Sequence, residues 1–146
     1  MGVEKVVLSE DNIILGASYP DKWEAIRACG KILLEQGYIR EEYIEDMMER
    51  ERLVSVYIGN HIAIPHGIAN SEKNILHSGI SVIQLAEGVD FGEEKAYLMF
   101  GIAGKDGAHV ELLSKIAVIC MDESNIQKMR KARNKKEIIE ILNGEL

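Results

Sequence analysis

Residues 58–68 read IGNHIAIPHGI, a stretch that begins like a buried strand and then places a histidine between a proline and a glycine. Proline has no backbone N–H and holds φ near about −65°, so the strand pattern of Ile62 and Ile64 is expected to end near Pro65. Gly67 then leaves the chain free to turn. The pattern predicts that His66 stands at the end of a strand on a stiff backbone. The simpler alternative is a histidine packed in a turn.

Two amphipathic helices are expected before this stretch. Over residues 21–36 apolar residues recur at helical spacing, and Asp21 and Glu24 hold the positions of a capping box. Residues 41–52 form the second helical pattern, with Arg50 near its C-terminal end. An arginine there is favourable to the helix dipole, so simple capping is an alternative to a role in a site.

Strands and a further helix are expected after the stretch. Residues 79–86 and 96–104 are apolar runs of strand length, and residues 87–95 between them form a turn-rich connection. A helical pattern then begins after Asp106 and places His109 in its first turn.

Two more short helices are expected to open at SNIQ, residues 124–127, and at NKKE, residues 134–137. No repeat, linker or low-complexity segment divides the chain. The sequence therefore predicts a single α/β domain over residues 1–146, with a small sheet between helices.

The bulk composition narrows the class of protein. The chain has 146 residues, 47% of them hydrophobic and 28% charged, as in an ordinary soluble domain. Its formal charge of −7 argues against a nucleic-acid surface. Cys29 and Cys120 lie among apolar residues, so we expect buried free thiols, consistent with a reducing cytoplasm.

We expect neither a leader nor a membrane anchor. The opening MGVEKVVLSED acquires charge at once, which is unlike a secretory leader. No apolar run approaches the roughly 20 residues that a membrane-spanning helix needs. If the protein serves a membrane process, we expect it to do so from solution.

Three features of the pattern could converge on one site: His66 at a strand end, His109 at a helix start and Arg50 at a helix end. Strand ends and helix N-termini meet in clefts of α/β folds, where unpaired N–H groups bind anions. A neutral imidazole has a lone pair that can attack phosphorus, and nearby positive donors stabilise the transferred group. Phosphoryl transfer is therefore the chemistry that these residues favour.

A zinc site is the rival interpretation. His61, His66 and His109 could ligate zinc together with a carboxylate, but their spacing matches no familiar zinc motif. The sequence also contains neither GxxxxGK[ST] nor GxGxxG, so a nucleotide-binding domain has little support. His77, in NILHSG, is most simply a surface or turn histidine.

Several segments, taken in order, resemble the mannitol/fructose class of enzyme IIA domains of the bacterial phosphoenolpyruvate-dependent sugar phosphotransferase system. They are DNIILG, KWEAI, YIEDMMERE, IGNHIAIPHG, GVDFGEE and GIAGKDGAHVELLSKIA, which together cover nearly the whole chain. The FGEE and GIAGKDG stretches look most like the mannitol-specific branch.

The resemblance implies a mixed sheet flanked by helices and assigns roles to the candidate residues. His66 matches the histidine that accepts a phosphoryl group from the carrier protein HPr. The group then passes to a cysteine of an enzyme IIB domain and on to a sugar that enters through the membrane IIC domain. His109 matches the second active-site histidine, and Arg50 matches the arginine that helps to bind the phosphoryl group. The resemblance implies a phosphotransferase without a metal or other cofactor.

Two positions depart from the family pattern. His61 stands where members commonly carry glycine, and Val56 stands where threonine is common. We expect His61 to face solvent or a partner, with a position at the cleft as the alternative. No IIB or IIC sequence adjoins the matched segments, so we expect a free-standing cytoplasmic component that meets HPr and the IIB domain of a IICB permease in solution. The alternative from another class is a regulatory relative that senses phosphorylation and feeds no transporter.

Overall fold

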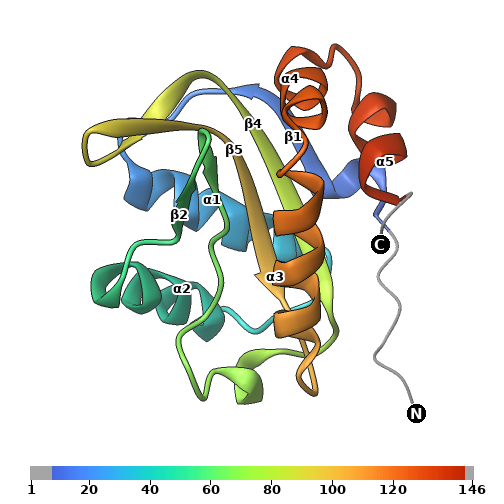
Figure 1. Ribbon diagram of the computed structural model, residues 1–146. Coiled ribbons are helices and arrows are strands. Elements are labelled where there is room, and N and C mark those ends of the chain that lie inside the picture. The colour runs from blue at the N-terminus through green and yellow to red at the C-terminus, as the bar shows by residue number, and fades with distance from the viewer. Residues whose placement is uncertain (1–7, 144–146) are drawn as a thin grey trace.

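A five-stranded mixed sheet organises the chain in the computed structural model, which describes residues 8–143 (Figure 1). The strand order is β1-β4-β5-β3-β2, with β1 parallel to β4, β4 antiparallel to β5, β3 parallel to β5, and β2 antiparallel to β3. The strands are β1 (Ile13–Ala17), β2 (Tyr57–Gly59), β3 (Ile62–Ala63), β4 (Gly79–Phe91) and β5 (Glu94–Ala103). The opening residues 1–7, on which the expectation of no leader partly rests, lie outside the described range.

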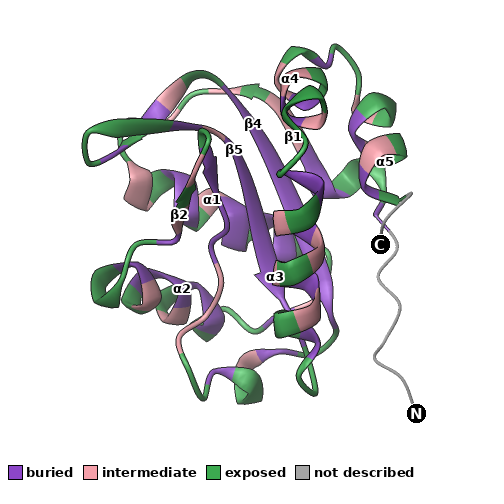
Figure 2. Ribbon diagram, viewed as in Figure 1, coloured by how far each residue is buried: buried purple, intermediate pink, exposed green. Residues whose placement is uncertain are grey.

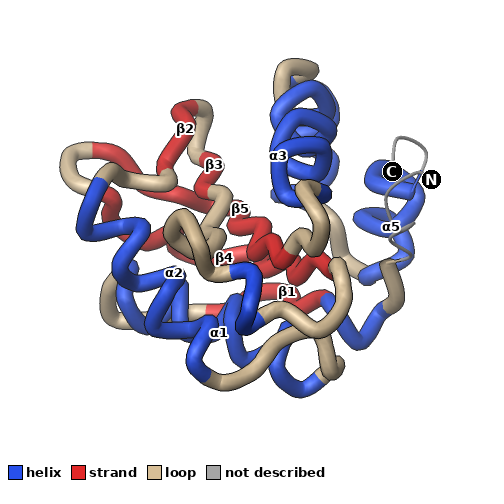
Figure 3. Tube along the Cα trace, turned by 90° about the horizontal axis from the view of Figure 1, so that it is seen from below, coloured by secondary structure: helices blue, strands red, loops and turns tan. Residues whose placement is uncertain are grey.

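Helices cover both faces of the sheet, as the view from below in Figure 3 shows. The helices are α1 (Lys22–Glu35), α2 (Glu42–Leu53), α3 (Ala108–Ile119), α4 (Glu123–Lys131) and α5 (Lys135–Asn143), with short 3-10 turns η1 (Glu10–Asn12) and η2 (Glu72–Asn74). One apolar core joins α1 and α2 to the sheet, and a second core joins α3, α4 and α5 to its other face. Most of β4 and β5 is consequently buried (Figure 2). The predicted small mixed sheet flanked by helices is confirmed.

Local signals placed the first helix correctly. The carboxylate of Asp21 accepts a hydrogen bond from the backbone N–H of Glu24 at 2.9 Å, so α1 begins at Lys22. The second helix, α2, also agrees with its predicted range to within one residue at each end.

The expected loop over residues 87–95 is wrong. β4 continues to Phe91 and β5 begins at Glu94, so only Gly92 and Glu93 lie between the strands. Val89 and Phe91 are buried while Asp90 is exposed, which is the period-2 alternation of a strand. An irregularity in register between Gln84 and Val89 interrupts that alternation and hides it in the sequence.

The fourth helix starts two residues earlier than a cap at Ser124 of SNIQ predicts. Asp122 is its N-cap and accepts from the N–H of Ser124 at 2.9 Å, so α4 begins at Glu123. The next helix follows the prediction, because the side-chain oxygen of Asn134 accepts from the N–H of Glu137 at 3.1 Å.

Both cysteines are buried free thiols, as predicted. Burial raises the pKa of each thiol to about 12, so both stay protonated near neutral pH. No helix within residues 8–143 is long and apolar enough to cross a bilayer.

The start of α3 depends on a close backbone approach. A Cβ placed on Gly104 would lie 2.1 Å from the backbone nitrogen of His109, closer than two such atoms can approach. Only glycine therefore lets the chain leave β5 and fold back into α3 at this point. This turn brings the first residues of α3 to the edge of the sheet where the segment after β3 also ends.

Candidate active site

The structure places His66, His109 and Arg50 around one cavity of about 370 Å³. The three residues come from the segment after β3, the first turn of α3 and the last turn of α2. Tyr43, Gly104 and Leu113 also line the cavity. The convergence that the sequence suggested is therefore present in the geometry.

His66 is half-buried beside β5, a little beyond the formal end of β3. The carbonyl of Pro65 accepts from the N–H of Ile102 at 2.9 Å, and His66 and Ile102 form an isolated parallel bridge. The chain therefore stays paired with β5 past the proline, and His66 is presented from that pairing.

Gly67 has a role different from the one expected. Its φ is not among the positive values, so no unusual turn requires a glycine there. A Cβ at this position would instead lie 2.5 Å from Cε1 of Tyr43. Gly67 is needed because its missing side chain leaves space for the tyrosine ring.

Hydrogen bonding fixes the tautomer of the His66 imidazole. Its Nδ1 lies 2.8 Å from the carbonyl oxygen of Ile64, which can only accept, so Nδ1 carries the proton. In the neutral ring the lone pair is then on Nε2. Burial lowers the pKa of His66 below its usual value, and the positive charges of Arg50 and His109 lower it further, against the opposing effect of the Ile64 carbonyl. The neutral imidazole, the form that can attack phosphorus, is favoured.

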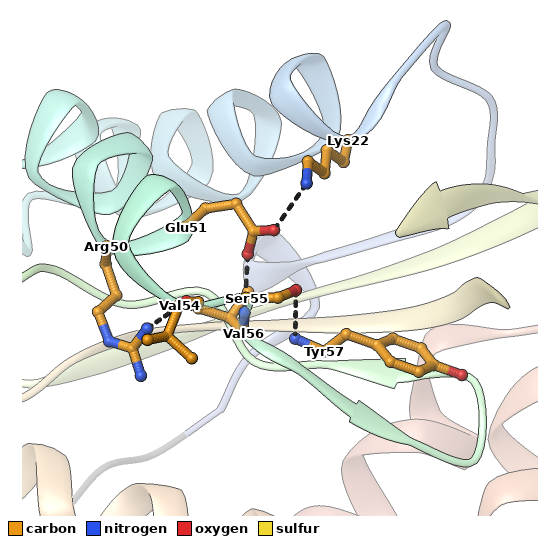
Figure 4. Close-up of polar contacts among 7 residues, drawn as sticks. All are labelled: Lys22, Arg50, Glu51, Val54, Ser55, Val56 and Tyr57. Carbon is orange, nitrogen blue, oxygen red and sulfur yellow. Dashed lines mark hydrogen bonds and ion pairs between the residues drawn. The ribbon is translucent and has the colours of Figure 1, made fainter. Parts of the chain in front are cut away.

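The two other candidates differ in how they are held. His109 is the second residue of α3 and is exposed, on the positive end of the helix dipole. Arg50 is half-buried, and its guanidinium donates to the carbonyl of Val54, the C-cap of α2 (Figure 4). Arg50 thus caps its helix and lines the cavity at the same time, so a capping role and a place in the site are compatible.

Glu51 is a structural neighbour of the site that the sequence analysis missed. Its carboxylate is buried and accepts from Lys22 Nζ at 2.9 Å and from the N–H of Val56 at 2.7 Å (Figure 4). These bonds tie the end of α2 to α1 and to the start of β2. The signal was available, because Tyr43, Met47 and Glu51 recur every four residues and therefore share the buried face of α2.

Val56, one of the two departures from the family pattern, is buried and does not line the cavity. A threonine hydroxyl at this position is therefore not required among the groups that face His66.

His61, the other departure, lies in a different place from His66. It is exposed and lines a separate cavity of about 200 Å³ with Glu94, Glu123 and Arg130. Its Nδ1 lies 2.9 Å from the carbonyl oxygen of Lys95, and its ring meets Tyr97 edge-on. The expectation of a position on the solvent or partner surface agrees with this geometry.

The backbone explains why glycine suits this position. Asn60 and His61 have φ values of 52° and 67° at the turn between β2 and β3, in the left-handed region that favours glycine. The zinc interpretation required His61, His66 and His109 to lie together, but His61 lines a different cavity from the other two. Within residues 8–143 no group of three or more His, Cys, Asp or Glu side chains could hold a metal ion.

Comparison with known proteins assigns the family. The family model described as "Phosphoenolpyruvate-dependent sugar phosphotransferase system, EIIA 2" matches residues 6–145. The chain belongs to this family.

Several of the similar proteins within the family are described as mannitol-specific. A "Mannitol-specific phosphotransferase enzyme IIA component" from Geobacillus stearothermophilus is 49% identical over 138 residues, which cover 94% of this chain and 95% of that protein. The crystal structure of IIA mannitol from Escherichia coli superposes with a TM-score of 0.86 at 36% identity, covering 92% of this chain and 98% of that one. The resemblance to the mannitol branch is confirmed.

A second solved structure shows a relative with a partner. It is a complex of enzyme IIAMTL and phosphorylated enzyme IIBMTL from Escherichia coli, and its matching chain superposes with a TM-score of 0.91 at 35% identity, covering 96% of this chain and 99% of that one.

The lowered pKa of His66 predicts a pH dependence of stability. In the window below about 6.5, the unfolded chain binds a proton at His66 that the folded chain does not yet bind. The free energy of unfolding should therefore fall as pH is lowered through this window. Urea unfolding of the parent and of His66→Gln at several pH values measures the effect, and the variant should have the shallower pH dependence. If the free energy of unfolding depended on pH identically in the parent and the variant, a lowered pKa of His66 in the folded chain would be contradicted.

The separate cavity of His61 predicts that this residue takes no part in the chemistry. His61→Gly should leave the rate of phosphoryl acceptance from phospho-HPr superimposable on the parent between about pH 6 and pH 8, the range in which a free imidazole titrates. Loss of one ionisation from the rate profile in His61→Gly would bring His61 into the site.

Proposed function

We propose that this chain is a phosphocarrier of the sugar phosphotransferase system, which accepts a phosphoryl group on Nε2 of His66 from phospho-HPr and passes it to a cysteine of an enzyme IIB domain. The hydrogen bond from Nδ1 of His66 to the carbonyl of Ile64 carries this proposal, because it leaves the Nε2 lone pair for attack. Membership of the family supports the same function.

Each transfer exchanges one bond to phosphorus for another. In the first, Nε2 forms a bond to phosphorus while the bond between phosphorus and the histidine of HPr breaks, and the HPr imidazole takes the electron pair. In the second, the thiolate of the IIB cysteine attacks phosphorus, and His66 leaves as a neutral imidazole. The exposed rim of the cavity suits this sequence, since two proteins must reach the same atom in turn.

Positive groups around Nε2 stabilise the phosphoryl group during transfer. Charge spreads over the three non-transferring oxygens during phosphoryl transfer. Arg50, His109 and the N-terminus of α3 supply positive charge and N–H donors at the same cavity. The same charges that lower the pKa of free His66 favour its phosphorylated form, because the added oxygens are negative.

The sugar is assigned through relatives, since in this function sugar never contacts the domain. The 49% identity to a mannitol-specific relative supports mannitol as the transported sugar, selected by the IIB and IIC partners. The two buried free thiols support a cytoplasmic site of action.

The experiment that tests this proposal asks whether His66 alone accepts the phosphoryl group. Incubation with phosphoenolpyruvate, enzyme I and HPr should add one acid-labile phosphate to the parent chain and none to His66→Ala, as measured by intact mass. His77→Ala is the control and should be labelled like the parent, because His77 is exposed and does not line the cavity. Label on His66→Ala would refute the assignment. Acceptance from phospho-HPr without onward transfer to a mannitol IIB domain would favour the regulatory alternative.

Arg50→Ala and His109→Ala should slow transfer without abolishing it. Removal of one oriented donor to the developing charge costs on the order of 10²- to 10³-fold in rate. Rapid-quench measurement of transfer to IIB checks the loss. Arg52→Ala is the matched control, because Arg52 lies on the same helix but is exposed and pairs with Glu45 at 2.8 Å. A parent-like rate in Arg50→Ala or His109→Ala would remove that residue from the mechanism.

A further inference from the structure

Tyr43 connects the segment that carries His66 to the neighbouring strand. The tyrosine lies on α2 and is only 2% exposed. Its hydroxyl donates to the carbonyl of Ile102 at 2.8 Å and accepts from the N–H of Gly67 at 2.8 Å. A single buried hydroxyl therefore joins β5 to the residue that directly follows His66.

The hydroxyl stands where a backbone hydrogen bond between neighbouring strands would otherwise form. In a parallel bridge, the strand residue opposite the histidine bonds to the carbonyl before that histidine and to the N–H after it. The first of these bonds is direct, from Ile102 N–H to the carbonyl of Pro65 at 2.9 Å. The second runs through Tyr43, which relays the Ile102 carbonyl to the N–H of Gly67. The backbone is thus held on both sides of His66.

The packing of the ring gives independent support. A Cβ on Gly67 would lie 2.5 Å from Cε1 and 2.9 Å from Cζ of Tyr43, so the ring lies directly against the glycine. The requirement for glycine after His66 and the hydroxyl relay therefore have the same cause. Burial raises the pKa of the Tyr43 hydroxyl, so the proton that it donates stays in place throughout the neutral range.

We propose that Tyr43 is a positioning residue for His66. It fixes the backbone on the C-terminal side of the histidine so that Nδ1 meets the Ile64 carbonyl and Nε2 faces the cavity. It acts through His66, since its hydroxyl is already bonded to the carbonyl of Ile102 and the N–H of Gly67. The proposal rests on the proposed function, in which Nε2 of His66 is the atom that accepts phosphate.

Tyr43→Phe tests the proposal, because it keeps the ring and removes only the hydroxyl. In nitrogen NMR spectra of the folded protein, His66 should change from the single tautomer with a proton on Nδ1 to a mixture of tautomers. Acceptance from saturating phospho-HPr should slow by about 10- to 100-fold, as expected for a reacting group displaced by a fraction of an ångström to an ångström. The half-saturating concentration of phospho-HPr should be unchanged, because the exposed surface is the same.

Tyr38→Phe is the matched control. The Tyr38 hydroxyl accepts from Asn12 Nδ2 at 3.2 Å and has no bond to the His66 segment. Tyr38→Phe should keep both the tautomer of His66 and the transfer rate of the parent.

The outcomes separate a positioning role from a merely structural one. If the folded signals of Tyr43→Phe keep the parent tautomer, and its rate per folded molecule equals that of the parent, the proposal is overturned. If Tyr43→Phe does not fold, the parent chain decides: a slowly exchanging Tyr43 hydroxyl proton close to the Gly67 amide proton supports the relay, and its absence refutes it. A parent chain that accepts no phosphate would sink the proposed function, while the tautomer comparison would still decide the role of Tyr43.

Discussion

The pairing of residues 62–67 with β5 is the constraint on which the site depends. Two paired residues of β3 and the bridge at Ile102 hold the chain alongside β5, the central strand, so the backbone at His66 belongs to the sheet and not to a loop. Pro65 cannot donate to a ladder, yet its carbonyl accepts from Ile102 and keeps the chain in register. A group that must present one nitrogen to two proteins in turn gains from such a backbone, since a rigid element holds geometry better than a mobile one.

The interaction of Arg50 and His109 with His66 changes from repulsive to attractive when His66 is phosphorylated. In the free protein, Arg50 and His109 oppose a positive charge on the imidazole, and burial acts in the same direction. Once phosphate is attached, the same groups face negative oxygens and become attractive. The site is therefore arranged for a neutral acceptor and an anionic product, which is the cycle of a phosphocarrier.

The position of Arg50 depends in turn on an ion pair between α1 and α2, in which the carboxylate of Glu51 is buried and Lys22 is partly exposed. Glu51 accepts from Lys22 on α1 and from the backbone of Val56 at the start of β2, and so fixes the turn in which Val54 accepts from Arg50 (Figure 4). A buried carboxylate needs such partners, because an unpaired charge in the core is strongly unfavourable. The C-terminal end of α2 is consequently held from two directions, and Tyr43, two turns earlier on the same helix, reaches the backbone beside His66.

The sequence by itself determined the elements whose causes are local. The Asp21 cap, the helix start before His109 and the helix end shortly after Arg50 follow from neighbouring residues. The ordered family motifs indicated the three candidate site residues. The alternation of buried and exposed residues that marks a strand could not be recognised where a bulge interrupts it, as in β4 before Val89 and Phe91. Only the tertiary structure decided which groups meet. Five residues of extended chain span about 16 Å, at roughly 3.3 Å per residue, so His61 and His66 can belong to different cavities although they are close in sequence. Tyr43 and Gly67 are 24 residues apart, yet their contact fixes His66. The distance between such groups depends on how helix α2 packs on the sheet, and no local pattern of residues encodes it.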